Sequence, residues 1–86
     1  MRDNLTVKVR EIVAGHFRVN PRQLTDESRL RDDLGADWLD RLELMIAVED
    51  QLAGLEITDV VAEQIETIGD LTRVVEMLHG SGGVLQ

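Results

Sequence analysis

Hydrophobic residues recur at helical spacing in several stretches of this chain, and none of them alternates with the period of two that marks a half-buried strand. The first stretch carries its apolar residues at Leu5, Val9, Ile12, Val13 and Phe17. Asp3 or Asn4 is available as the N-cap of this helix. The helix should end near Val19, because Pro21 disfavours helical backbone at Asn20.

A linker of about residues 22–35 follows, in which Leu24, Leu30 and Leu34 are the expected buried anchors. It is longer than the usual connection between bundle helices, which predicts ordered turns instead of slack chain.

The second helix is predicted from Asp37 or Trp38 to Ala53, with Gly54 just beyond its end. At about 100° per residue its apolar positions cover an arc of roughly 220°, whereas a surface helix needs little more than about 100° to pack on its own core. Those positions are Leu39, Leu42, Leu44, Met45, Ile46, Val48 and Leu52. Some of them should therefore face a cavity or a partner, while Asp40, Glu43 and Asp50 share the opposite arc.

Two helices are predicted in the last third of the chain. A short one covers about residues 60–64. The final one has Thr67 as N-cap with Asp70 completing a capping box, carries its apolar residues on one face, and ends at Gly80. Those apolar residues are Leu71, Val74, Val75 and Leu78. The pattern predicts an all-α bundle of three main helices plus one short helix over residues 1–80, followed by a flexible tail, 81–86.

Composition narrows the class of protein. The 86 residues, 43% of them hydrophobic, are enough for one small domain with one modest core. No cysteine is present, so no disulfide or thiolate metal site is possible, and a reducing compartment is consistent with this. No apolar run approaches the roughly 20 residues that span a bilayer, and the polar start does not read as a signal peptide. We expect a cytoplasmic protein.

Charge is unevenly distributed along the chain, whose formal net charge is −8. Residues 1–36 contain six acids and seven bases, whereas residues 37–76 contain eleven acids and two bases. The acidic second half would repel nucleic acid and suits a basic patch on a protein partner. An acidic surface that only maintains solubility is the alternative.

Residues 33–44, DLGADWLDRLEL, resemble the D-L-G-x-D-S-L-D-x-x-E-L signature of acyl carrier proteins. Residues 26–34, the pair Glu49 and Asp50, and residues 57–70 also resemble that family, so the likeness covers about residues 4–79. It implies an acyl-carrier-like helical bundle around an apolar cavity. It also implies a non-enzymatic protein of fatty-acid or polyketide-type biosynthesis and lipid metabolism.

The resemblance further implies a partner-binding surface on the second helix. Its acidic contacts would be Asp37, Asp40, Glu43 and Glu49, its apolar anchors Leu39, Leu42 and Ile46, and Asp59 and Glu63 would extend the acidic strip. The implied partners are acyl-chain synthases, transferases or ligases with basic docking patches. The protein itself is expected to be a monomer.

Trp38 departs from the family at its most important position. There the family has a serine that carries 4′-phosphopantetheine, and tryptophan has no hydroxyl to esterify. No cofactor is therefore expected for this sequence, although the arm would attach if residue 38 were serine. Arg41 is a second departure, which places a positive charge inside the acidic strip.

Other chemistry is sparse. His16 and His79 are far apart in the sequence, and without nearby cysteines or tightly paired carboxylates both read as surface residues, so neither a metal site nor a catalytic residue is expected. Three interpretations stay open. The chain is a carrier-like docking protein that is never loaded, a genuine carrier whose serine has been replaced, or a non-covalent binder of a fatty acyl ligand with Trp38 as its lid.

Overall fold

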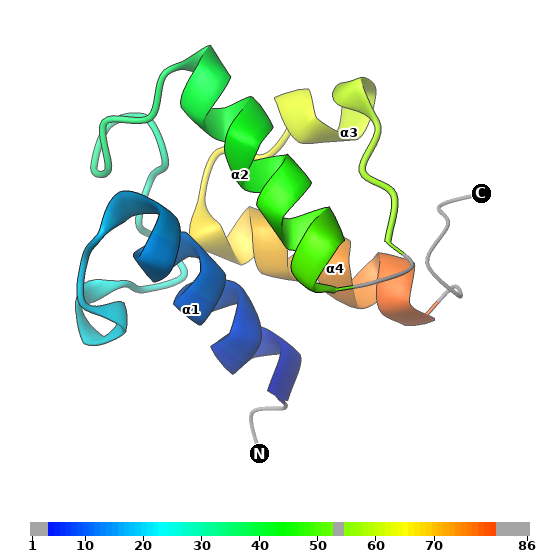
Figure 1. The fold of residues 1–86 in the computed structure, drawn as a ribbon, viewed down its shortest axis with the longest axis horizontal. Coiled ribbons are helices and arrows are strands. Elements are labelled where there is room, and N and C mark those ends of the chain that lie inside the picture. Colours follow the sequence, from blue (N-terminus) through cyan, green and yellow to red (C-terminus); the bar gives the residue numbers. More distant parts are fainter. Residues whose placement is uncertain (1–3, 53–54, 81–86) are drawn as a thin grey trace.

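The computed structural model describes residues 4–52 and 55–80, which form α-helices and one 3-10 turn (Figure 1). The elements are α1 (Asn4–Phe17), η1 (Pro21–Gln23), α2 (Trp38–Gln51), α3 (Asp59–Glu63) and α4 (Ile68–Gly80). Within the described residues the only β-type pairing is an isolated bridge between Arg29 and Thr67, so the all-α prediction is confirmed. The suggested N-cap at Asp3, the predicted end of the second helix at Ala53 and Gly54, and the tail 81–86 lie outside the described residues.

The core lies where α1 packs against both α2 and α4 (Figure 1). Val9 and Val13 of α1, Leu44 and Val48 of α2, and Leu71 of α4 are completely buried there. These are residues that the helical periodicity assigned to inner faces. None of the helices in the described part of the chain is long and apolar enough to cross a membrane.

α1 ends at Phe17, slightly before the predicted end near Val19. Arg18 adopts a left-handed backbone conformation with φ of 57°. The amide of Val19 then donates to the carbonyl of Ala14 at 3.0 Å, which is the six-to-one hydrogen bond of a Schellman cap. Glycine is the usual residue at such a position, so an arginine there gives no sequence signal for the end of the helix.

The long linker is ordered, as its length predicted, and it is fastened to the start of α4. Of its expected anchors Leu24 and Leu30 are buried, whereas Leu34 is only half-buried. The amide of Leu30 donates to the Glu66 carbonyl at 2.9 Å, and the Leu30 carbonyl accepts from Ala36 at the same distance. The amides of Ile68 and Gly69 donate back to linker carbonyls. Gly69 must be small, because a Cβ there would lie 3.0 Å from the Asp26 carbonyl oxygen.

The predicted capping box at the start of α4 is confirmed. Asp70 donates its amide to the Thr67 hydroxyl at 3.0 Å, and its carboxylate accepts from the amides of Glu66 and Thr67, both at 3.1 Å. Partial burial by itself would raise the pKa of the Asp70 carboxyl. The hydrogen bonds from Glu66 and Thr67, together with the charge of Arg73, outweigh it and hold that pKa below its usual value.

The lowered pKa of Asp70 predicts an acid-sensitive contribution to stability. It is present above the unfolded-state pKa of about 3.9 and is lost as the pH falls through the lower folded-state pKa. Asp70→Asn should therefore be less stable than the parent at neutral pH and should lose less stability between about pH 5 and pH 2. Urea unfolding across that range measures this. Asp50→Asn on α2 controls for the change in net charge, and equal acid slopes for the parent and Asp70→Asn would contradict the prediction.

Candidate functional site

The start of α2 is built by a reciprocal capping box within the acyl-carrier-like run. Asp37 is the N-cap, whose carboxylate accepts from the amide of Asp40 at 2.8 Å. Asp40 returns the interaction, because its carboxylate accepts from the Asp37 amide at 3.3 Å. Two acidic side chains at this end also suit the positive end of the helix dipole. Trp38 is therefore the first residue of α2, and 75% of its surface is exposed.

Exposed apolar residues continue along α2 and across to α3. The predicted anchors Leu39, Leu42 and Ile46 are all exposed, whereas Leu44, Met45 and Val48 of the same helix are buried. The broad apolar arc therefore divides into a core-facing part and a solvent-facing part. Val60 of α3 is also exposed, and no sequence pattern had assigned it to this surface.

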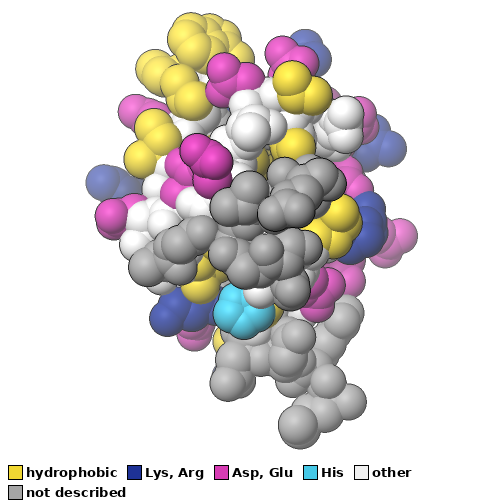
Figure 2. Space-filling view, turned by 90° about the vertical axis from the view of Figure 1, so that its right-hand side faces the viewer, with side chains coloured by type: hydrophobic (Ala, Val, Ile, Leu, Met, Phe, Trp, Pro, Cys, Tyr) yellow, Lys and Arg dark blue, Asp and Glu magenta, His cyan; other side chains and the backbone are white. Residues whose placement is uncertain are grey.

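Carboxylates are interspersed with these apolar side chains. Asp37, Glu43, Asp59 and Glu63 are exposed, and Asp40 is half-buried. We call this surface the α2–α3 face; it comprises Asp37, Trp38, Leu39, Asp40, Leu42, Glu43, Ile46, Asp59, Val60 and Glu63. Figure 2 shows hydrophobic and acidic side chains intermingled at the top of the molecule, the end at which α2 begins in Figure 1.

A hollow of about 310 Å³ opens between α2 and α3 beside Trp38. Trp38 and Leu42 form one side of it and Ala62 of α3 another, with Asp59, Glu63 and Arg41 around them. An apolar floor with carboxylates beside it suits an elongated side chain that has an apolar stem and a positive end.

Glu49 differs from the other predicted contact residues because it is half-buried and already engaged. Its carboxylate accepts from the backbone amide of Ile57 at 2.5 Å, so it holds the segment that leads into α3 against α2. Unlike the carboxylates of Asp37 and Asp40, whose hydrogen bonds stay within the first turn of α2, the Glu49 carboxylate joins two separate segments of the fold. We therefore do not include Glu49 in the α2–α3 face.

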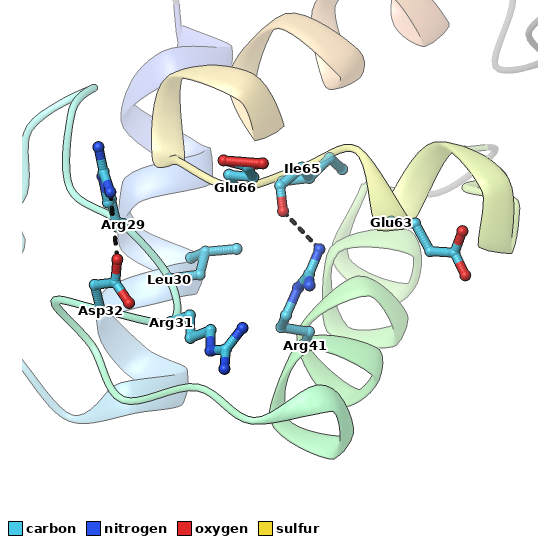
Figure 3. Close-up of a pocket in the computed structure, with 8 residues that line it drawn as sticks. All are labelled: Arg29, Leu30, Arg31, Asp32, Arg41, Glu63, Ile65 and Glu66. Atoms are coloured by element: carbon cyan, nitrogen blue, oxygen red, sulfur yellow. Dashed lines mark hydrogen bonds and ion pairs between the residues drawn. The ribbon is translucent and has the colours of Figure 1, made fainter.

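Arg41 has a structural role in the fold. From the sequence it was interpreted only as a positive charge inside the acidic strip. Its guanidinium donates to the carbonyls of Ala62 and Ile65, at 2.9 Å and 2.7 Å, and so ties the end of α3 to α2. In Figure 3 Arg31 and Arg41 point into a second hollow, of about 250 Å³, while Glu63 points away from Arg41. Arg41 therefore neutralises less of the strip than its position in the sequence suggested.

The hydroxyl groups of the described residues have structural roles in the core, in helix caps or in the linker. Thr6 and Thr72 are buried, and the Thr72 hydroxyl donates to the Ile68 carbonyl at 3.0 Å. Thr58 and Thr67 are helix caps. Ser28 accepts from the Thr25 amide at 3.0 Å within the linker, which confirms its interpretation as a turn residue. Each of these hydroxyls therefore belongs to a helix, a cap or a turn, and the start of α2 presents an indole instead.

The sequence shows no tightly paired carboxylates around either histidine, but the fold brings two carboxylates to one of them. His16, in the last turn of α1, lies beside Asp40 and Glu43 of α2, and one ligand atom from each of the three falls within 4.8 Å of the others. The packing of α1 on α2 brings these residues together, and no local sequence signal could have paired them.

The Arg41 tether predicts a local effect on α3. Arg41→Met should destabilise the fold by about 1–3 kcal/mol, because two partly buried carbonyls lose a charged donor. It should also speed amide hydrogen exchange at Ala62, Gln64 and Ile65 more than in α1. Urea unfolding and exchange measured by NMR test this, with Arg31→Met as the matched control, since the exposed side chain of Arg31 makes no hydrogen bond or ion pair within the described residues and only its backbone carbonyl accepts, from Gly35. Unchanged exchange in α3 would contradict the assignment.

Comparison with known proteins agrees with this architecture. Residues 7–75 match the family model described as the phosphopantetheine attachment site. The chain is 43% identical over 68 residues to an acyl carrier protein of Wolinella succinogenes, with 79% of this chain and 88% of that protein covered. It is 45% identical over 69 residues to one from a Bradyrhizobium strain, with 80% and 86% covered.

A solved structure of an acyl carrier protein from Enterococcus faecalis superposes with a TM-score of 0.69 at 37% identity, covering 84% of this chain and 91% of that one. A family match over most of the chain, together with relatives at this identity and coverage, establishes the family. This chain belongs to the acyl carrier protein family.

Proposed function

We propose that this protein is an acyl-carrier-like docking protein of fatty-acid or polyketide-type biosynthesis that binds partner enzymes but does not carry 4′-phosphopantetheine. The observation that carries the proposal is Trp38, an exposed indole at the first position of α2. In the run of residues 33–44 that resembles the family signature, this is the position of the attachment serine. Acyl carrier proteins are carriers and not enzymes. We place the protein in the cytoplasm as a monomer.

The α2–α3 face supports docking on a basic partner. Its carboxylates surround exposed apolar side chains, a combination that gives an interface both charge complementarity and desolvated contact area. Charges at the rim of such an interface mainly raise the association rate, and small interfaces of this kind are transient. The hollow beside Trp38 would receive a lysine or arginine side chain of the partner.

The absence of a suitable hydroxyl supports the claim that the arm is not attached. Attachment of 4′-phosphopantetheine requires a hydroxyl oxygen that becomes part of a phosphodiester, and the indole of Trp38 offers none. The hydroxyls of the described helices and linker are occupied in caps, turns or the core. The residues present therefore do not fit the prosthetic group of the family.

A loading reaction tests this directly. Incubation with coenzyme A, Mg²⁺ and a permissive phosphopantetheinyl transferase should leave the mass of the protein unchanged, whereas Trp38→Ser should gain one phosphopantetheine. Trp38→Ala, which also lacks a hydroxyl, is the matched control and should stay unmodified. Intact-protein mass spectrometry reads all three. A gain of one arm by the parent protein would refute the proposal.

Docking is tested separately by competition. The unmodified protein should inhibit the loading of a second, serine-containing acyl carrier protein by the same transferase, because it would occupy the docking site without reacting. Glu63→Lys should weaken that inhibition about fivefold at low salt and less at high salt. Lysine suits the C-terminal end of α3, so this variant should fold.

Glu76→Lys on α4 makes the same charge change outside the α2–α3 face and is the control for docking. Equal inhibition by the Glu63 and Glu76 variants would show that the face does not dock. The absence of any inhibition by the parent protein would remove docking from the proposal, even if loading also fails.

The lid interpretation has one supporting observation, since Trp38 lines the hollow of about 310 Å³. That hollow is open towards solvent between α2 and α3. Four of its six lining residues belong to the α2–α3 face, namely Trp38, Leu42, Asp59 and Glu63. Docking of a partner side chain therefore accounts for the hollow with fewer assumptions than storage of a free fatty acid.

A further inference from the structure

We propose that His16, Asp40 and Glu43 bind a divalent transition-metal ion of the zinc type, which bridges α1 and α2. The three residues come from two helices, and one ligand atom from each lies within 4.8 Å of the other two. An imidazole with two carboxylates is a ligand set suited to first-row transition metals, and it differs from the all-oxygen sets that suit Mg²⁺.

The distances leave a space of the right size. For three atoms that all lie within 4.8 Å of one another, some point lies about 2.8 Å or less from each of them, against metal–ligand distances of about 2.0–2.2 Å for zinc. Closing that gap requires each ligand atom to move by about 0.8 Å or less. Glu43 is exposed and the other two side chains are half-exposed, so small side-chain rotations suffice.

Two of the ligands are already oriented by other contacts. The ring of His16 packs edge-on against Phe17, with the ring centroids 4.9 Å apart and the planes at 82°. One carboxylate oxygen of Asp40 is held by the Asp37 amide, which leaves the other oxygen available. Outer contacts of this kind orient metal ligands and strengthen binding.

Charge also favours a dication here. Asp40 and Glu43 supply two negative charges that balance a divalent ion. The guanidinium of the adjacent Arg41 is turned to the carbonyls of α3. Lys8 lines the same groove between α1 and α2 as His16, but it is eight residues earlier, or about 12 Å along α1. Three protein ligands would leave at least one coordination position for water.

Metal binding at this place would have a structural and a functional consequence. It would fasten the last turn of α1 to the first turns of α2, which stabilises the folded state by an amount that grows with the logarithm of the metal concentration above the dissociation constant. It would also engage Asp40 and Glu43, so zinc would weaken docking through the α2–α3 face. The second consequence rests on the proposed function, whereas metal binding itself is testable on this chain alone.

The experiment is a calorimetric titration of the full chain with Zn²⁺, accompanied by thermal unfolding with and without the metal. We expect one saturable site, a rise in the unfolding temperature, and a loss of affinity of roughly tenfold or more in His16→Gln. Glu43→Gln should weaken binding similarly. His79→Gln, which changes the only other histidine, is the matched control and should bind like the parent.

A titration with Mg²⁺ serves as the control for general attraction of cations to the acidic surface, because Mg²⁺ does not favour an imidazole ligand. Zinc binding that is equal in the parent and in His16→Gln, or that is lost in His79→Gln, would overturn the proposal. So would the absence of saturable zinc binding by the parent. Failure of the zinc titration would leave the loading and docking experiments unaffected.

Discussion

The backbone of Leu30 holds the linker in place, and the arrangement of α2 depends on it. Its amide bonds to the carbonyl of Glu66 just before α4, and its carbonyl accepts from Ala36 just before α2. The Leu30 side chain is 1% exposed, and full burial of a leucine contributes about 1.5–3 kcal/mol. The ion pair between Arg10 and Asp26, at 2.6 Å, adds a connection from α1 to the same linker. A single buried residue thus joins the start of α2 to the start of α4.

The α2–α3 face follows from this anchorage. Once Ala36 is fixed, the Asp37 and Asp40 capping box begins α2 directly after it, and Trp38 is presented to solvent at the first position of the helix. α3 is too short to be stable alone. It is held by contacts from α2, through Arg41 at its end and Glu49 at the segment before it. The exposed surface is therefore supported from beneath by polar contacts of α2 itself.

The sequence predicted most of the fold because helical periodicity and capping are local. The four helices, the cap at Thr67, and the buried linker residues Leu24 and Leu30 were recognisable from spacing and residue type, whereas Asp37 was predicted only as a possible first residue of the second helix. The broad apolar arc of the second helix predicted that some of its apolar residues face a cavity or a partner, and the family resemblance named Leu39, Leu42 and Ile46, which are exposed. The end of α1 was predicted two residues late, because Arg18 takes the conformation that usually identifies a glycine. The roles of Arg41 and Glu49 were missed because their partners lie in α3 and in the segment before it.

By itself the sequence determined which residues form helices, that the second half is acidic, and that position 38 has no hydroxyl, since each of these depends on residue type or short-range spacing. Only the tertiary structure decided which carboxylates are free to meet a partner and which already serve the fold. It also brought His16 of α1 to Asp40 and Glu43 of α2, residues more than twenty positions away. Contacts of that kind depend on how whole helices pack on a shared core, which the periodicity of one helix does not specify.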